Sequence, residues 1–512
     1  MRKAVKEQIL QLLKILLEAH GEVKSYIKKE EYDNVRGILA DCQECAVLIG
    51  TTIEQFDANQ AAIIEDLEEY CEALFFVHED MGKGLPADGN EIKSMLDTRV
   101  KKICEKIKSD IRTELKVVFM PYKASMWTSL ASIWAAAKAD SDCEVKVVVI
   151  PYYNLDRKQQ PTELVYEAPL FPAEVDITHY GNYNLEAEQP DMIFIHNPYD
   201  DTNNVTRVPQ QYYSYNLKKY TEKLIYSPYG MMGFYNPDKG AFMCCTNGVM
   251  VADKVLVQSE RVKQIYIDHG VERGKLVALG SPKVDAIVDG LKKPVSYPEG
   301  WEAKLKGRKV FLLNTHLSYF LKGYVYAMEN PGKSDFAKHA HDITFDRLLN
   351  QEGCALIWRP HPLLKATLRS RNFHESLAFV EDLERRIKES DNAVLDTNGS
   401  YDDAFRISDA LITTYSSMIP EYMISGKPIY IYEKRLNEDF CRKSPVNYLN
   451  NYYRGRGEEE PQFPKFVDMV LNGEDFLYEK RMEDVYRAFS NLDGTVGENV
   501  YKKLKEEWQI LP

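Results

Sequence analysis

The sequence contains little that favours a membrane-spanning, disulfide-bonded or nucleic-acid-binding protein. Cysteine is scarce, with nine residues in 512, and no pair of C-x-x-C motifs has the spacing of a zinc site. This usage is typical of a reducing compartment and argues against a disulfide framework. No uncharged apolar stretch approaches the ~18 residues that a membrane span requires. The 65 basic and 78 acidic residues give a formal net charge of −13, which argues against a general nucleic-acid binder.

The first residues also lack a secretion signal. Met1-Arg2-Lys3 provides the basic start of such a signal, but charged residues interrupt the apolar segment that must follow. We therefore expect a cytoplasmic protein, with peripheral attachment to the inner face of the cell membrane left open. Apolar residues make up 44% of the chain, enough for several folded cores, and the length suggests about three domains.

Residues 1 to about 113 have the apolar periodicity of α-helices. In the first of these helices, apolar residues recur at spacings of three, four or seven: Val5, Ile9, Leu12, Leu16, Val23 and Ile27. Short connections between the helical segments predict an antiparallel hairpin or small bundle over residues 1–113. The stripe is typical of packing against other helices, including those of a homodimer partner. A membrane-surface helix over residues 1–20 is the alternative interpretation.

From residue 114 onward, short β-branched runs alternate with helical stretches, as in βαβ units. The first set of predicted strands is Lys116–Met120, Glu144–Ile150, Asp191–Ile195, Lys223–Tyr226 and Lys254–Val257. The second set is Lys309–Leu313, Ala355–Trp358, Asn392–Leu395, Ala410–Thr413 and Pro428–Tyr432. A segment with prolines and glycine at 292–307 separates the sets and predicts a hinge. We predict an α/β fold with two tandem Rossmann-like domains, over 114–295 and 296–512, behind the helical domain.

Polar residues gather where the predicted strands end, which is the edge at which parallel sheets bind ligands. They are His196-Asn197-Pro198-Tyr199-Asp200, Asn314-Thr315-His316, Arg359-Pro360-His361 and Thr414-Tyr415-Ser416-Ser417. Arginine, serine hydroxyls and a helix N-terminus suit a phosphate, and imidazoles suit proton transfer near neutral pH. Each residue also has a structural interpretation: a hydrogen-bonded rim histidine, a serine N-cap or an arginine salt bridge. Because all of them fall on one class of position, we favour a functional cleft.

The usual glycine-rich fingerprints of nucleotide binding are absent. The chain has no G-x-x-x-x-G-K-[ST] motif, and no G-x-G-x-x-G motif follows the first predicted strand. NAD(P) binding and P-loop ATP hydrolysis are therefore poor interpretations. The sequence indicates no metal site, and we expect no cofactor.

Several segments together carry a family resemblance. They are Ser408–Ser417 followed by Gly426-Lys427-Pro428-Ile429, Arg359-Pro360-His361, and Gly280-Ser281-Pro282-Lys283-Val284-Asp285. These segments resemble motifs of the CDP-glycerol:poly(glycerophosphate) glycerophosphotransferase family of bacterial teichoic acid synthesis. Segments of the first domain resemble a subgroup of that family: Ser125–Leu130, Val148–Tyr153 and His196–Asp200. The resemblance covers about residues 115–440 and implies a GT-B-type fold, with CDP-glycerol held mainly by the second domain.

The resemblance also implies roles for individual residues. His196 and His361 match the family's two key histidines, and a histidine would accept the proton of the acceptor hydroxyl. The implied donor-binding residues are Arg359, Ser416, Ser417, Thr315, Glu421 and Gly280. The implied activity is transfer of glycerol phosphate, or a related polyol phosphate, from a CDP-activated donor. The acceptor would be a hydroxyl of a lipid-linked wall precursor or a capsular glycan, and CMP would be released.

Some positions depart from the family pattern. Asn197 replaces the glycine of a Trp-His-Gly segment, Leu317 replaces the arginine of a Pro-Thr-Trp-Arg segment, and Thr414 replaces an aspartate. Two alternatives therefore stay open. One is a nucleotide-sugar-dependent glycosyltransferase on the same scaffold, and the other is a catalytically inactive protein that binds a nucleotide or glycan.

Overall fold

The chain folds into two compact units. The computed structural model describes residues 1–56, 59–156, 158–314, 317, 320, 336–414, 416–432, 438–448, 452–455 and 462–509. One unit contains residues 1–116, 140–144 and 508–512, and the other contains residues 117–139 and 145–507. The first unit is mainly helical, and the second holds most of the β-structure.

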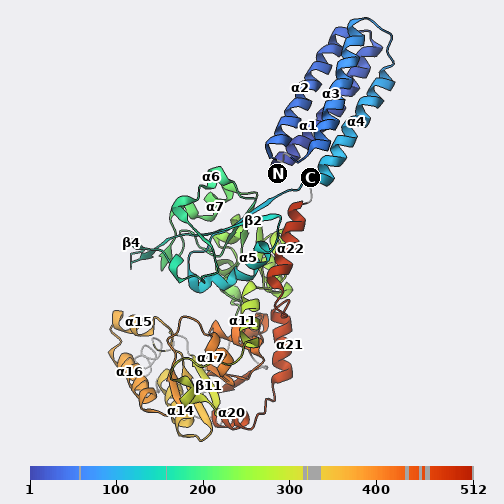
Figure 1. Ribbon diagram of the computed structural model, residues 1–512. Helices are drawn as coiled ribbons and strands as arrows, with labels where there is room; N and C mark the ends of the chain where they lie inside the picture. Colours follow the sequence, from blue (N-terminus) through green and yellow to red (C-terminus); the bar gives the residue numbers. More distant parts are fainter. Residues whose placement is uncertain are drawn as a thin grey trace. The chain divides into compact units, whose positions relative to one another are not determined.

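Four long helices form the N-terminal part of the chain (Figure 1). They are α1 (Lys3–Lys28), α2 (Tyr32–Phe56), α3 (Ala61–Gly82) and α4 (Gly89–Asp110). Each contacts the next along the chain, and α4 contacts α1, which closes the bundle. On α1, Ile9, Leu16, Val23 and Ile27 are buried, so the predicted apolar stripe faces the bundle core. Membrane contact and dimerisation through these helices stay predictions.

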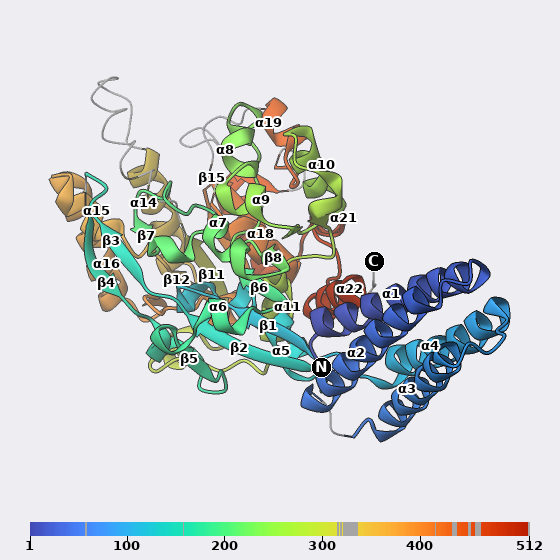
Figure 2. The same cartoon turned by 90° about the horizontal axis from the view of Figure 1, so that it is seen from above.

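The first β-sheet has seven parallel strands in the order β10-β9-β8-β6-β1-β2-β5. Figure 2 labels β8, β6, β1, β2 and β5 of this sheet. In chain order they are β1 (Leu115–Phe119), β2 (Cys143–Val149), β5 (Ile177–His179), β6 (Met192–Ile195), β8 (Lys223–Tyr226), β9 (Lys254–Leu256) and β10 (Leu276–Val277). The non-sequential order produces the crossovers of a doubly wound sheet, so β1 lies between β6 and β2. The carboxyl ends of these three strands therefore lie side by side.

A small antiparallel sheet follows the carboxyl end of β2. Its strands run in the order β4-β3-β7 and are β3 (Tyr152–Leu155), β4 (Pro161–Val165) and β7 (Thr206–Arg207). This sheet is absent from the predicted strands, because β4 is mostly exposed and β7 is only two residues long. Strands of this kind lack the apolar run that marks a strand in sequence.

The second large sheet has six parallel strands in the order β13-β12-β11-β14-β15-β16. They are β11 (Lys309–Asn314), β12 (Cys354–Trp358), β13 (Ala393–Leu395), β14 (Ala410–Thr413), β15 (Ile429–Tyr432) and β16 (Tyr453–Gly455). Strands β12, β14 and β15 are buried along their whole length, as expected of parallel strands covered on both faces. The two parallel sheets and the helical N-terminus confirm the predicted fold class.

Helix α11 (Pro282–Lys292) connects the two sheets. It contacts η1 (Ala124–Ser129) and α5 (Ala131–Lys138) beside the first sheet. It also contacts α17 (Asp402–Ile407) and η8 (Met423–Ser425) beside the second. Buried Asp285 on α11 accepts hydrogen bonds from the Val496 and Gly497 amides, at 3.0 and 2.8 Å, and so holds the start of α22 (Val496–Gln509). Among the described residues, no helix has both the length and the apolar character needed to cross a membrane.

Candidate functional site

The carboxyl edge of the second sheet brings together three of the predicted polar segments. Strand β11 lies between β12 and β14, so Asn314, Arg359 and Ser416 end or follow neighbouring strands. The Asn314 side-chain amide donates to the Arg359 carbonyl at 2.8 Å, and the Arg359 backbone amide donates to the Leu313 carbonyl at 2.9 Å. Hydrogen bonds between neighbouring strands therefore fix the positions of Asn314 and Arg359 at this edge. Thr315, predicted to bind the donor, lies outside the described residues.

Arg359 is buried and already paired. Its Nη1 lies 2.5 Å from Oδ2 of Asp396, a buried carboxylate that follows β13, and its Nη2 donates to the Asn398 carbonyl at 2.9 Å. Oδ1 of Asp396 accepts from the Asn398 amide at 3.0 Å. These bonds fix the plane of the guanidinium and use two of its five N–H groups. Asp396 and Asn398 therefore fix the orientation of Arg359, and phosphate binding by Arg359 stays a prediction.

Ser416 and Ser417 differ in their surroundings. The Ser416 hydroxyl accepts from the Met418 amide at 3.3 Å and lies 3.1 Å from the Thr413 hydroxyl. It therefore satisfies an amide at the start of α18 (Met418–Tyr422), as the capping interpretation predicts. Ser417 is exposed and makes no side-chain capping bond. Phosphate binding by either hydroxyl stays a prediction.

Glu421 belongs to a cluster that the sequence analysis did not identify. Its Oε1 lies 2.5 Å from Nζ of Lys283, which comes from α11. The Tyr401 hydroxyl also bonds to Glu421, and burial together with this carboxylate raises the pKa of Tyr401 well above its usual value, while Arg359 opposes the shift. Nζ of Lys283 lies 5.7 Å from the centre of the Tyr401 ring. Two partners thus compete with any ribose for Glu421, and its contact with the donor stays a prediction.

His361 follows β12 and is partly exposed. Its Nδ1 accepts a hydrogen bond from the Leu363 backbone amide at 3.1 Å. A backbone N–H can only donate, so this bond places the proton of the neutral ring on Nε2. Burial lowers the pKa of His361 below its usual value. In this tautomer Nε2 carries the N–H of the neutral ring, and the lone pair of Nδ1 is engaged by the Leu363 amide.

His196 follows β6 and is fully buried. Its Nε2 accepts from the Tyr122 backbone amide at 3.1 Å, and its Nδ1 lies 3.2 Å from the Ser129 hydroxyl. Burial lowers its pKa to about 3, with a backbone bond to Met126 opposing the shift and the charge of Lys123 adding to it. Both ring nitrogens therefore hold the loop after β1 in place. The expectation that His196 and His361 face each other across one crevice stays a prediction.

Gly280 precedes α11, and its backbone explains the need for glycine. Its φ is +111°, and an added Cβ would lie 2.7 Å from the Ser490 carbonyl oxygen and from a Val496 methyl group. The structure gives Gly280 a packing role, and its predicted contact with the donor is untested.

We predict that Gly280→Ala destabilises the chain by about 2–4 kcal/mol, through backbone strain and overpacking. Denaturant unfolding measures this loss. Gly290→Ala is the matched control, because Gly290 is inside α11 and nothing lies within 4 Å of its added Cβ. If Gly280→Ala raises the KM for the donor without changing stability, the residue serves the donor and the packing role is wrong.

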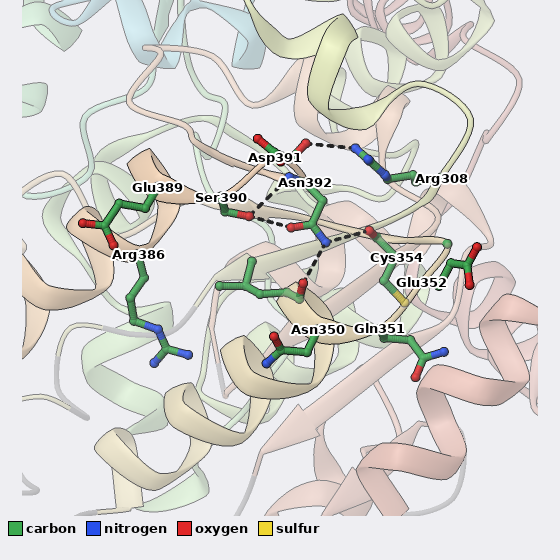
Figure 3. Close-up of a pocket in the computed structure, with 12 residues that line it drawn as sticks. Arg308, Asn350, Gln351, Glu352, Cys354, Arg386, Glu389, Ser390, Asp391 and Asn392 are labelled. Carbon is green, nitrogen blue, oxygen red and sulfur yellow. Dashed lines mark hydrogen bonds between the residues drawn. The ribbon is translucent and has the colours of Figure 1, made fainter.

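A polar pocket of about 640 Å³ lies at the opposite edge of the second sheet (Figure 3). Arg308, Cys354 and Asn392 line it from the amino ends of the β11, β12 and β13 segments. Arg308 donates to the Asp391 carbonyl at 3.0 Å, and the Asn392 amide donates to the Cys354 carbonyl at 3.1 Å. These side chains satisfy backbone carbonyls between the strands. Because ligands bind at carboxyl ends in such sheets, we do not place the site here.

A family comparison identifies the chain. The sequence model of the CDP-Glycerol:Poly(glycerophosphate) glycerophosphotransferase family matches residues 246–506, just over half of the chain. The chain belongs to this family. The match includes Gly280, Arg359, His361, Ser416, Ser417 and Glu421, and it begins after His196.

Two curated relatives agree with this family assignment, and a solved structure is similar in fold. Teichoic acid ribitol-phosphate polymerase TarK of Staphylococcus aureus is 24% identical over 255 residues, which cover 49% of this chain and 45% of TarK. Teichoic acid poly(ribitol-phosphate) polymerase of Bacillus spizizenii is 22% identical over 261 residues, covering 49% and 37%. The chain thus spans less than half the length of these relatives. The S. aureus MnaA–UDP co-structure has a TM-score of 0.50 at 13% identity, covering 78% of this chain and 98% of MnaA, and supports the GT-B-type fold.

Proposed function

We propose that the chain transfers glycerol phosphate or a related polyol phosphate from a CDP-activated donor to a hydroxyl of a wall or capsular glycan precursor. Family membership supports the class of reaction. The main structural support is the Arg359–Asp396 pair at the carboxyl edge of the second sheet. It presents a fixed guanidinium with spare donors where such sheets bind nucleotides.

The proposed reaction is a displacement at phosphorus. The acceptor oxygen forms a bond to the phosphorus next to the polyol, and the bond from that phosphorus to the oxygen bridging to CMP breaks. Positioning and charge neutralisation lower most of the barrier in such reactions. Arg359 neutralises charge on the diphosphate, and His361 donates from Nε2 to the phosphate oxygen that leaves with CMP. The acceptor proton passes to a phosphoryl oxygen and then to solvent.

The sequence-based alternative makes His361 or His196 the general base. For His361, a base at Nε2 requires the other tautomer and the loss of the Leu363 bond. For His196, it requires release of Nε2 from the Tyr122 amide. The structure therefore supports hydrogen-bond donation by His361 and a positioning role for His196.

A donor panel tests the proposed function. The full chain is incubated with CDP-glycerol, CDP-ribitol, UDP-glucose, UDP-N-acetylglucosamine or GDP-mannose, with and without a glycerol phosphate oligomer, and the released nucleotide is quantified. We expect CMP release from a CDP-polyol that increases when the oligomer is added. Release of UDP or GDP instead would establish the glycosyltransferase alternative. Nucleotide binding without turnover of any donor would establish the inactive binding protein.

A further inference from the structure

Lys123 is half-buried, and among the residues that the structure describes no acidic side chain pairs with it. It lies in the loop after β1, and within the described part of the chain no hydrogen bond or ion pair involves its Nζ. Two cations described above differ in this respect, because Arg359 pairs with Asp396 and Lys283 of α11 pairs with Glu421. An ammonium group whose three N–H donors are not used by the described residues can bind an anion.

Two tyrosine rings hold the Lys123 ammonium in place. Nζ lies 4.9 Å from the centre of the Tyr152 ring and 5.5 Å from that of the Tyr122 ring. Glu167 is the nearby acid, but its two oxygens already accept from the Tyr152 hydroxyl at 2.5 Å and the Ala124 amide at 2.8 Å. Burial lowers the pKa of Lys123, and Glu167 opposes the shift. The rings stabilise the cation without using its N–H donors, so these remain available to a ligand.

The loop that contains Lys123 lies next to His196, one of the two predicted catalytic histidines. Strand β1 is flanked by β6 and β2, and the loop after β1 is fixed by His196 through the Tyr122 amide. Tyrosine hydroxyls surround the same strand ends: Tyr122 bonds to Thr206, and Tyr229 bonds to Tyr199. One cation among hydroxyl groups suits a phosphate attached to a polyol better than it suits a nucleobase.

We propose that Lys123 binds a phosphate group of the acceptor, a polyol phosphate without a nucleotide. This assignment rests on the proposed function and extends it, since it adds an acceptor-phosphate subsite in the first sheet. The subsite holds the acceptor chain by its terminal or neighbouring phosphate, while the hydroxyl to be modified extends towards the donor. His196 contributes by fixing the loop, not by taking a proton.

Direct binding tests the assignment without turnover. The full chain is titrated with sn-glycerol 3-phosphate in a calorimeter, with glycerol as the uncharged comparison. We expect Lys123→Met to raise the Kd about 10- to 100-fold, the effect of losing one charge-assisted hydrogen bond. Lys123→Arg should stay within a few-fold of the unmodified chain. Lys219→Met is the matched control, because exposed Lys219 precedes β8 at the amino edge of the same sheet.

Kinetics separate this assignment from the proposed function. If CMP is released, Lys123→Met should raise the KM for a glycerol phosphate oligomer about 10- to 100-fold and leave the KM for the CDP-polyol unchanged. Unchanged glycerol 3-phosphate binding in a folded Lys123→Met variant, or no binding by the unmodified chain, would overturn the assignment. An equal rise in both KM values would overturn it as well. Lys123-dependent phosphate binding without turnover of any donor would refute the transferase function but retain the phosphate site.

Discussion

Replacing His361 by alanine is expected to lower the rate of CMP release by about 10²–10³-fold, the usual cost of removing one hydrogen-bond donor from a developing anion. The Leu363 amide donates to Nδ1, so the neutral ring carries its proton on Nε2, and the proposed reaction uses this N–H as a donor to the leaving phosphate oxygen. Steady-state measurement of CMP release from the CDP-polyol gives the result. His374→Ala is the control, because His374 is exposed at the start of α16 (His374–Glu389) in the same sheet's helical layer.

His361→Gln distinguishes a hydrogen-bond donor from a base. The glutamine amide places an N–H near the position of Nε2 but cannot accept a proton, so a donor role predicts turnover within about 10-fold of the unmodified chain. A base role predicts a loss of about 10²–10⁴-fold in the glutamine variant.

The pH profile of CMP release gives a second readout of the role of His361. Burial lowers the pKa of His361 below 6.5, so a base would stay active at pH 6.5 and lose activity only at more acidic pH. A hydrogen-bond donor keeps its Nε2–H in both protonation states of the ring, so it causes no fall in activity at acidic pH.

The second sheet illustrates what sequence patterns predict well. Strands such as β12 and β14 are buried throughout, and uninterrupted apolar runs mark them clearly. The rule that ligands bind at carboxyl ends then predicts that Asn314, Arg359 and Ser416 lie on one edge of the sheet. The pairing of β11 with both β12 and β14 confirms that these residues belong to neighbouring strands.

Contacts between distant residues account for what the sequence did not predict. Glu421 pairs with Lys283 across 138 positions, and Arg359 pairs with Asp396 across 37. The sequence around Glu421 or around Arg359 does not indicate which residue pairs with it. One partner of His196 is the Tyr122 backbone amide, and every non-proline residue carries such an amide, so no side-chain motif indicates this bond. The sequence pattern therefore predicts which polar residues follow the strands, whereas tertiary packing determines which of their atoms are already hydrogen-bonded.

The Arg359–Asp396 pair gives the largest expected effect on stability. Arg359→Met leaves the Asp396 carboxylate buried without its counterion, and breaking a buried pair in this way costs about 3–5 kcal/mol. Denaturant unfolding measures the loss, and amide hydrogen exchange in β12 and β13 localises it to the second sheet. Met482→Ala on α21 (Tyr478–Ala488) is a control for general loosening, because Met482 is only partly buried beside this core.

The double variant Arg359→Met/Asp396→Asn separates the structural role of the pair from its role in the reaction. Asparagine keeps an oxygen that accepts from the Asn398 amide at the position of Oδ1, and no charge remains buried. We therefore expect most of the lost stability to return, because a pair removed together costs less than one partner removed alone. CMP release should nevertheless stay about 10²–10³-fold below that of the unmodified chain, since the donor diphosphate still lacks its guanidinium. Recovery of turnover along with stability would show that Arg359 only supports the fold, and the phosphate of the donor would then have to be bound by other residues.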